Sequence, residues 1–158
     1  MALPTLPSPA PMNAADDNRP AIVIDTQVVM DWLVFRDARV QPLVSAVSER
    51  RLRWLVAPGM RDELRHVISR GVAASYRPDL TFIEAQFDAF ATAVADAPPQ
   101  PLAGRMVCRD PDDQKFIDLA VAARARWLVS RDKALLALAK RARLRDLAIV
   151  TPERWSLG

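Results

Sequence analysis

The chain has 158 residues, 51% of them hydrophobic, which suits one domain with a sizeable core, and 22 basic against 19 acidic residues give a modest net charge of +3. No stretch approaches the roughly 18 uninterrupted apolar residues of a membrane span, and the N-terminus lacks the basic start and apolar centre of a signal peptide, so we expect a cytoplasmic protein. The single cysteine, Cys108, excludes an internal disulfide, and without a Cys/His cluster we expect no structural zinc site.

The chain opens with a proline-rich segment. Residues 1–19 contain repeated prolines and almost no branched apolar residues, so we expect a flexible tail there and a single domain over residues 20–158. The run AIVID at 21–25 is typical of a strand buried on both faces. Apolar residues at helical spacing follow as far as Phe35, and Pro42 begins a second amphipathic helix.

The middle of the chain predicts further alternation of strands and helices. WLVA at 54–57 has the pattern of a buried strand, and the apolar spacing over 60–70 is helical. We expect one long helix over 78–97, because aromatic and apolar residues recur at helical spacing and prolines follow. The short apolar run MVC at 106–108 predicts a third strand.

The last third of the chain completes the pattern. It predicts a helix over 114–125, a strand at 127–130, a helix over 133–142 and a final strand at 147–152. Strands that alternate with helices favour a three-layer α/β/α domain around a central, mostly parallel sheet. In such sheets ligands bind beyond the carboxyl ends of the strands, near a switch in strand order.

Four acidic residues lie where a predicted strand ends or a predicted helix begins: Asp25, Glu63, Asp113 and Asp132. Because the carboxyl ends of parallel strands meet at one edge of a sheet, we expect all four carboxylates at the same edge. Carboxylates beside apolar segments are costly unless something offsets their charge. Oxygen ligands in such a group suit a hard divalent cation, Mg²⁺ or Mn²⁺.

Simpler explanations exist for each acid. A carboxylate at a helix start is favoured by the helix dipole without any metal. Asp112 competes with Asp113 for one of the four places, and Asp62 competes with Glu63 for another. Asp118 fits a helix surface better than the site, and we do not assign a catalytic role to His66 or Cys108.

Four motifs in this order resemble the PIN-domain ribonucleases: IDT at the end of the first strand, the helical glutamate in RDELRHVI, the helix start DPDDQKF and the following VSRD. The match is closest to the bacterial branch of toxin components of toxin–antitoxin pairs. It covers roughly residues 21–155 and ends in TPERW. The motifs are weak singly but fairly specific when all four occur at suitable spacing.

The resemblance implies a metal-dependent endoribonuclease that hydrolyses RNA phosphodiesters. Its four acidic positions match Asp25, Glu63, Asp113 and Asp132, which would be both the catalytic residues and the ligands of Mg²⁺ or Mn²⁺. The resemblance also implies a cognate antitoxin protein as partner and a homodimer.

Five neighbouring residues are candidates for supporting roles at the same site. Thr26 and Ser130 can hydrogen-bond a ligand, while Asp110 and Asp112 flank the third acid and could bind metal themselves. Gln27 departs from the family, which usually has Asn or Ser after the D-T pair. Gln keeps the amide but adds a methylene, so its hydrogen bond to a ligating carboxylate must be re-aimed.

Two other functions remain open on the sequence alone. The departure at Gln27 fits a catalytically weak PIN-like module that binds RNA or a protein partner. An α/β phospho-acceptor with Asp25 as nucleophile is the third interpretation, although IDTQV lacks the second acid that such sites usually have.

Basic residues form two clusters along the chain. One comprises Arg50, Arg51 and Arg53, and the other lies between Lys140 and Arg145. Such clusters can contact phosphates, and binding of that kind weakens steeply with salt. A solubilising surface is the simpler explanation of these charges, because basic helix faces are common in proteins that bind no nucleic acid.

Overall fold

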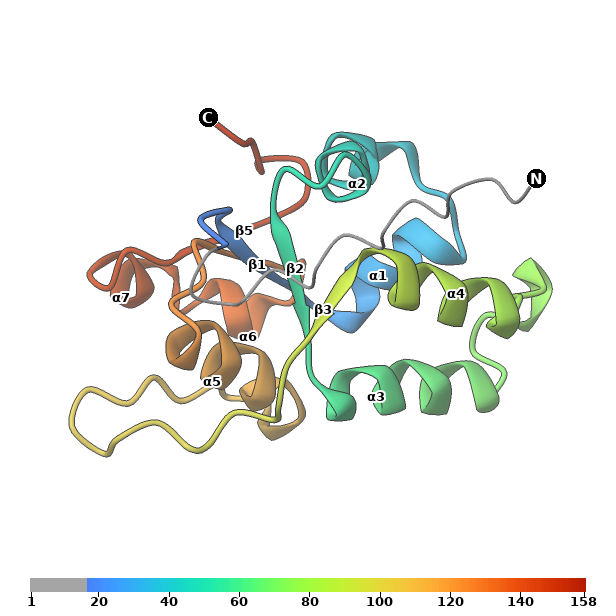
Figure 1. The fold of residues 1–158 in the computed structure, drawn as a ribbon. Coiled ribbons are helices and arrows are strands. Elements are labelled where there is room, and N and C mark those ends of the chain that lie inside the picture. Colours follow the sequence, from blue (N-terminus) through green and yellow to red (C-terminus); the bar gives the residue numbers. More distant parts are fainter. Residues whose placement is uncertain (1–16) are drawn as a thin grey trace, which may run out of the picture.

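A computed structural model describes residues 17–158 of the protein. These residues form a five-stranded sheet in the order β3-β2-β1-β4-β5, and helices cover both of its faces (Figure 1). This confirms the predicted three-layer α/β/α architecture. The strands and α-helices in chain order are β1 (Ala21–Ile24), α1 (Thr26–Leu33), α2 (Gln41–Ser48), β2 (Arg53–Val56), α3 (Pro58–Ser69), α4 (Leu80–Phe90), β3 (Ala91–Ala93), α5 (Gln114–Ala122), β4 (Trp127–Val129), α6 (Lys133–Leu136), α7 (Ala139–Arg143) and β5 (Ala148–Val150).

The central strands are apolar on both faces because helices cover both sides of the sheet. β1 is buried at every residue, and it pairs in parallel with β2 through Ile22 and Trp54 and with β4 through Val23 and Leu128. Every strand pair among residues 17–158 is parallel. On one face Trp54 packs with ring centroids 5.0 Å from both Trp32 of α1 and Phe87 of α4.

The strand order reverses beside β1. The chain runs outward from β1 to β2 and β3, and then returns to the other side of β1 to form β4 and β5. Right-handed crossovers therefore place α1 to α4 on one face of the sheet and α5 to α7 on the other. The carboxyl ends of β1 and β4 lie next to each other at this switch point, where α/β proteins bind their ligands.

The third strand lies elsewhere than the sequence predicts. The expected helix over 78–97 stops at Phe90, and Ala91–Ala93 form β3 against β2 with Trp54 opposite Ala91. Alanine has high helix propensity, so the segment ATA gave no strand signal. Pairing with the exposed edge of β2 overrides that local preference.

The predicted strand at 106–108 is wrong, although Met106 and Cys108 are as buried as strand residues. Side-chain amides form the hydrogen bonds to this segment's backbone that a neighbouring strand would otherwise form. Gln100 accepts from Met106 N at 3.0 Å and donates to Met106 O at 3.1 Å, while Gln114 accepts from Cys108 N at 2.7 Å and donates to Met106 O at 3.0 Å. These amides fix the long connection between β3 and α5 without a sixth strand.

Asp118 belongs to the same network and not to the helix surface expected for it. It is buried on α5, and its Oδ1 accepts hydrogen bonds from Gln100 Nε2 at 2.8 Å and from Gln114 Nε2 at 2.9 Å. The two amides compensate the cost of burying this carboxylate. The network ties the connection to α5 just before the segment that carries Asp110 and Asp113.

The helix expected over 133–142 is divided into α6 and α7. Leu138 N bonds to Leu135 O, one residue closer than in an α-helix, and this tightened turn ends α6. Residues 1–16 of the expected tail lie outside the described residues, so the tail stays a prediction. No helix within 17–158 is long and apolar enough to cross a membrane.

We predict that Gln100→Ala destabilises the protein by about 1–3 kcal/mol, because it leaves the buried Met106 N–H without a partner and removes a donor from Asp118. Urea unfolding followed by circular dichroism measures the change. Leu102→Ala in the same connection is the control, since Leu102 is 88% exposed and its truncation should be nearly neutral. Equal midpoints for the Gln100 variant and the parent would show that the amide network contributes nothing.

Candidate functional site

Two of the predicted acids cap helices at the carboxyl ends of neighbouring strands. Asp25 follows β1, and its Oδ1 accepts a 3.0 Å hydrogen bond from Val28 N in the first turn of α1. Asp132 follows β4, and its Oδ1 accepts a 2.7 Å bond from Ala134 N at the start of α6. Capping bonds and the positive helix ends offset part of the negative charge of both carboxylates. The simple helix-cap explanation is therefore correct, and it is compatible with a second role.

Glu63 and Asp113 come from segments on opposite faces of the sheet. Glu63 lies on α3, and its Oε2 accepts a 2.6 Å hydrogen bond from the Thr26 hydroxyl and lies 3.1 Å from Lys115 Nζ. Asp113 ends the 3₁₀ turn Pro111–Asp113 directly before α5. Thr26 belongs to α1 and Lys115 to α5, so Glu63 is fixed from both sides of the sheet.

All four of these acids line one cavity of about 360 Å³ at the carboxyl edge of the sheet. The structure thus brings together the residues that the sequence places at this edge, while their catalytic role stays a prediction. The wall also contains apolar and basic side chains. The complete lining is Asp25, Thr26, Gln27, Met30, Glu63, Val67, Asp113, Phe116, Arg131 and Asp132.

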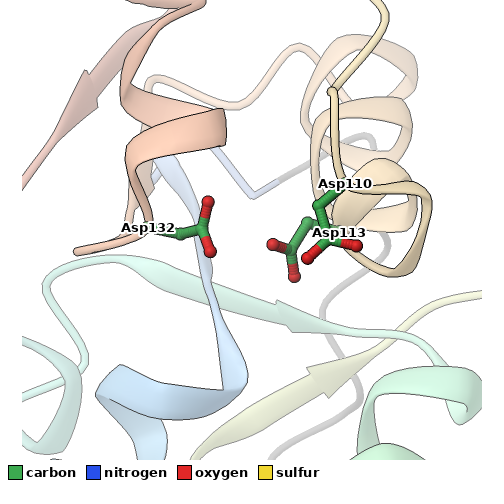
Figure 2. A group of neighbouring side chains, drawn as sticks. All are labelled: Asp110, Asp113 and Asp132. Atoms are coloured by element: carbon green, nitrogen blue, oxygen red, sulfur yellow. The ribbon is translucent and has the colours of Figure 1, made fainter.

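Within this region three carboxylates form a tighter group. One oxygen each from Asp110, Asp113 and Asp132 lies within 4.8 Å of the others. Figure 2 shows Asp110 and Asp113 reaching from the segment before α5 towards Asp132 at the start of α6. On the sequence alone Asp110 could be a metal ligand or a supporting group, and the structure places one of its oxygens with those of Asp113 and Asp132. Asp25 and Glu63 line the cavity outside this group.

The group carries more negative charge than its surroundings neutralise. Burial, followed by the nearby carboxylates of Asp132 and Asp110, raises the pKa of Asp113 to about 7. Burial also raises the pKa of Asp25, against the opposing effect of its hydrogen bonds from Ser130 and Val28. A bound cation would supply the missing counter-charge and would favour the ionised forms of Asp25 and Asp113.

Ser130 joins the acids of the two central strands. The Ser130 hydroxyl donates a hydrogen bond to Asp25 Oδ2. The Ser130 hydroxyl oxygen in turn accepts a 2.9 Å hydrogen bond from Asp132 N. Ser130 is fully buried at the end of β4, so this link cannot swing into solvent. A buried serine therefore sets the orientation of Asp25 relative to the turn that carries Asp132.

The remaining candidates divide clearly by position. Asp112 is exposed and does not line the cavity, so Asp113 occupies the place for which the two residues compete. Gln27 does line it, but its Nε2 lies 3.5 Å from Asp31 Oδ1, and its amide is thus directed towards Asp31. His66 and Asp62 are exposed on α3 and outside the lining.

The sequence interpretation did not assign Arg131 to the site and did not identify its two anchors. Arg131 lines the cavity, where Nη1 pairs with Asp31 Oδ2 and Nη2 lies 2.5 Å from Glu153 Oε1. Asp31 is buried on α1, and a buried acid in mid-helix was the signal that something basic must face it. Arg131 itself directly precedes Asp132, and Lys115 lies within the DPDDQKF motif.

Comparison with known proteins gives a family and a fold. A family model described as PIN domain matches residues 21–134, a span that contains all five acids of the site. Among solved structures, the chain is similar to the crystal structure of VapBC2 from Rickettsia felis bound to a DNA fragment from their promoter, with 9% identity and a TM-score of 0.56. That alignment covers 86% of this chain and 99% of the other. No curated protein matched.

The raised pKa of Asp113 makes stability depend on pH when no cation is bound. The folded protein holds this proton up to about pH 7, whereas an unfolded chain releases it near the ordinary value of 3.8. The folded state therefore binds more protons between these values, and the free energy of unfolding falls as the pH rises from about 4 to about 7.

We predict that Asp113→Asn removes this fall in the free energy of unfolding with rising pH. In EDTA the variant should be more stable than the parent above about pH 7, and the difference should shrink towards about pH 4. Thermal unfolding across this range measures it. Asp112→Asn, next in sequence but exposed, is the matched control and should show no such pH-dependent gain. A constant difference between Asp113→Asn and the parent at all pH values would contradict the proposed repulsion.

Proposed function

The chain belongs to the PIN-domain family, and from that membership we propose that it is a metal-dependent endoribonuclease that hydrolyses RNA phosphodiesters. PIN domains are generally nucleases. The observation that carries the proposal is the group of Asp110, Asp113 and Asp132, whose oxygens lie within 4.8 Å of one another beside a cavity. A site that cleaves phosphodiesters with the help of a metal ion needs several carboxylates in a hollow to hold that ion.

The residues present fit a hard divalent cation. In octahedral coordination two oxygens on opposite sides of Mg²⁺ lie about 4.2 Å apart and two adjacent oxygens about 3 Å apart, so the three carboxylates would move closer together to share one ion. The group contains carboxylate oxygens without nitrogen or sulfur, which favours Mg²⁺ or Mn²⁺ over Zn²⁺. We propose that Asp110, Asp113 and Asp132 hold the ion, and that Asp25 and Glu63 complete the set from the cavity wall.

When bound, such an ion polarises the phosphate and makes a coordinated water more acidic. The protein supplies the orientation. Ser130 and Val28 N fix the two oxygens of Asp25, and Thr26 fixes Glu63. These side chains are set before the substrate arrives, so little ordering remains to be done during the reaction.

Two basic residues would hold the RNA phosphate against this acidic wall. Arg131 uses Nε and one hydrogen on each terminal nitrogen for Asp31 and Glu153, which leaves one N–H on each terminal nitrogen for a phosphate oxygen. Lys115 has three donors, and Glu63 and the Asp112 carbonyl engage two of them. Anchored guanidinium groups bind phosphate with little loss of side-chain freedom.

We further propose that the chain is the toxin of a toxin–antitoxin pair and acts in the cytoplasm. The support is the fold shared with VapBC2, a structure described as bound to a promoter DNA fragment. The partner would be an antitoxin that covers the acidic cavity. A homodimer is the assembly we propose for the chain alone, supported by exposed apolar side chains that include Val72, Tyr76 and Phe82.

Cleavage of single-stranded RNA should require both the acids and a divalent ion. We predict that EDTA abolishes cleavage, that Mn²⁺ restores it, and that Asp113→Asn and Asp25→Ala each lower the rate by more than about 100-fold. Asp112→Asn should cleave at nearly the parent rate, because Asp112 is exposed and outside the cavity. Undiminished cleavage by Asp113→Asn would rule out this mechanism. Binding of RNA without turnover at any Mn²⁺ concentration would instead favour a binding module.

The toxin role makes a separate prediction in cells. Expression of the parent should arrest bacterial growth, expression of Asp113→Asn should not, and co-expression of a small DNA-binding protein encoded beside it should restore growth. Light scattering of the purified chain, alone and with that protein, gives the masses of the homodimer and of the complex. Growth arrest by Asp113→Asn at equal protein levels would separate toxicity from RNA cleavage.

A further inference from the structure

Four arginines gather at the end of α5 that lies away from the acids. Arg124 and Arg145 line a hollow of about 350 Å³ between this end of α5 and the start of β5. Arg145 Nη2 donates to the Gly104 carbonyl, and Arg141 Nη2 donates to the Arg105 carbonyl at 3.0 Å. The connection between β3 and α5 therefore folds back against the region around α7, which brings the backbone of Arg105 to the same place. We call Arg105, Arg124, Arg141 and Arg145 the arginine cluster.

The cluster has no acidic counterpart of equal size. None of its members forms an ion pair with a carboxylate of residues 17–158, whereas Arg61, Arg65 and Arg131 each bind two. Asp146 is the one carboxylate in the lining of the hollow. Unpaired guanidinium groups held close together repel one another and attract anions.

Two details show that the cluster is built into the fold. Gly104 has φ +75°, and a Cβ at this position would collide with Arg145 Nη2, so a glycine is needed for Arg145 to reach the backbone. The Nε of Arg105 is buried and, within the described part of the chain, has no hydrogen-bond partner. A buried donor without a partner is costly.

We propose that the arginine cluster binds the phosphate backbone of RNA outside the cleaved linkage, an inference that rests on the proposed ribonuclease function. α5 connects the two regions, since it begins directly after Asp113 and ends two residues before Arg124. Its nine residues span about 13 Å, a distance that a strand of several nucleotides can bridge. Guanidinium groups bind phosphate through paired hydrogen bonds as well as charge, and they do so without regard to base sequence.

The test is the salt dependence of binding to a single-stranded RNA oligonucleotide in EDTA, measured by fluorescence anisotropy with the full chain. Each phosphate contact contributes about 0.7 to the slope of log K against log salt concentration. Arg124→Gln/Arg145→Gln should therefore lower the slope by about 1.4. Arg124→Gln alone, whose side chain makes no hydrogen bond in residues 17–158, should lower it by about 0.7 even if the double variant is unstable.

The matched control is Arg36→Gln/Arg77→Gln. These arginines are also exposed and line another hollow, and like Arg124 they have positive φ, so the control removes the same charge from similar backbone positions. The control should leave the slope unchanged. An unchanged slope in the Arg124 variants, or an equal fall in the control, would overturn the proposal.

A cleavage assay separates this proposal from the ribonuclease function itself. With Mn²⁺ present, the double variant should cleave a dinucleotide as fast as the parent, because that substrate cannot reach from the acids to the arginine cluster. Cleavage of a long single strand should show a higher KM and an unchanged kcat. If the parent cleaves neither substrate, the ribonuclease function fails while the binding slopes still test the cluster. If the double variant matches the parent in KM on the long strand, the cluster takes no part in holding RNA.

Discussion

Repulsion among carboxylates at the carboxyl ends of β1 and β4 is the constraint on which the site depends. The strand order reverses at this point, so Asp25 and Asp132 end adjacent strands and cannot be kept apart. The connection before α5 adds Asp110 and Asp113 to the same place. The pKa of Asp113, raised to about 7 by burial and its neighbours, expresses that repulsion in energetic terms.

The protein offsets part of this repulsion with its own groups. Helix N-termini face Asp25 and Asp132, the buried Ser130 links the two strand ends, and Lys115 neutralises Glu63. Arg131 is only partly available for this purpose because Asp31 and Glu153 hold it. The remaining excess of negative charge fits the proposed cation site, since a fully neutralised pocket would not need a cation. The unneutralised charge thus lowers the stability of the folded protein at the place where the function is proposed.

Much of the fold follows from the pattern of apolar runs. AIVI and WLV are buried strands because helices cover both faces, and the acids after them had to meet once the sheet was parallel. The position of β3 could not be read, because the pairing of Ala91–Ala93 with β2 is a long-range contact without a local signal. Met106 and Cys108 indicated a strand that does not form. They are as buried as strand residues, but the amides of Gln100 and Gln114 hydrogen-bond their backbone in place of a neighbouring strand. Arg131 was not assigned to the site because its partner Asp31 lies 100 residues away.

Titration of Mn²⁺ into the metal-free protein near neutral pH tests the central claim most directly. If the acids form one cation site with Asp113 partly protonated, calorimetry in buffers of different ionisation enthalpy should record the release of about half a proton per bound ion at about pH 7. Asp113→Asn should bind the ion much more weakly and release less. Equal affinity and equal proton release in the parent and in Asp113→Asn would contradict the account.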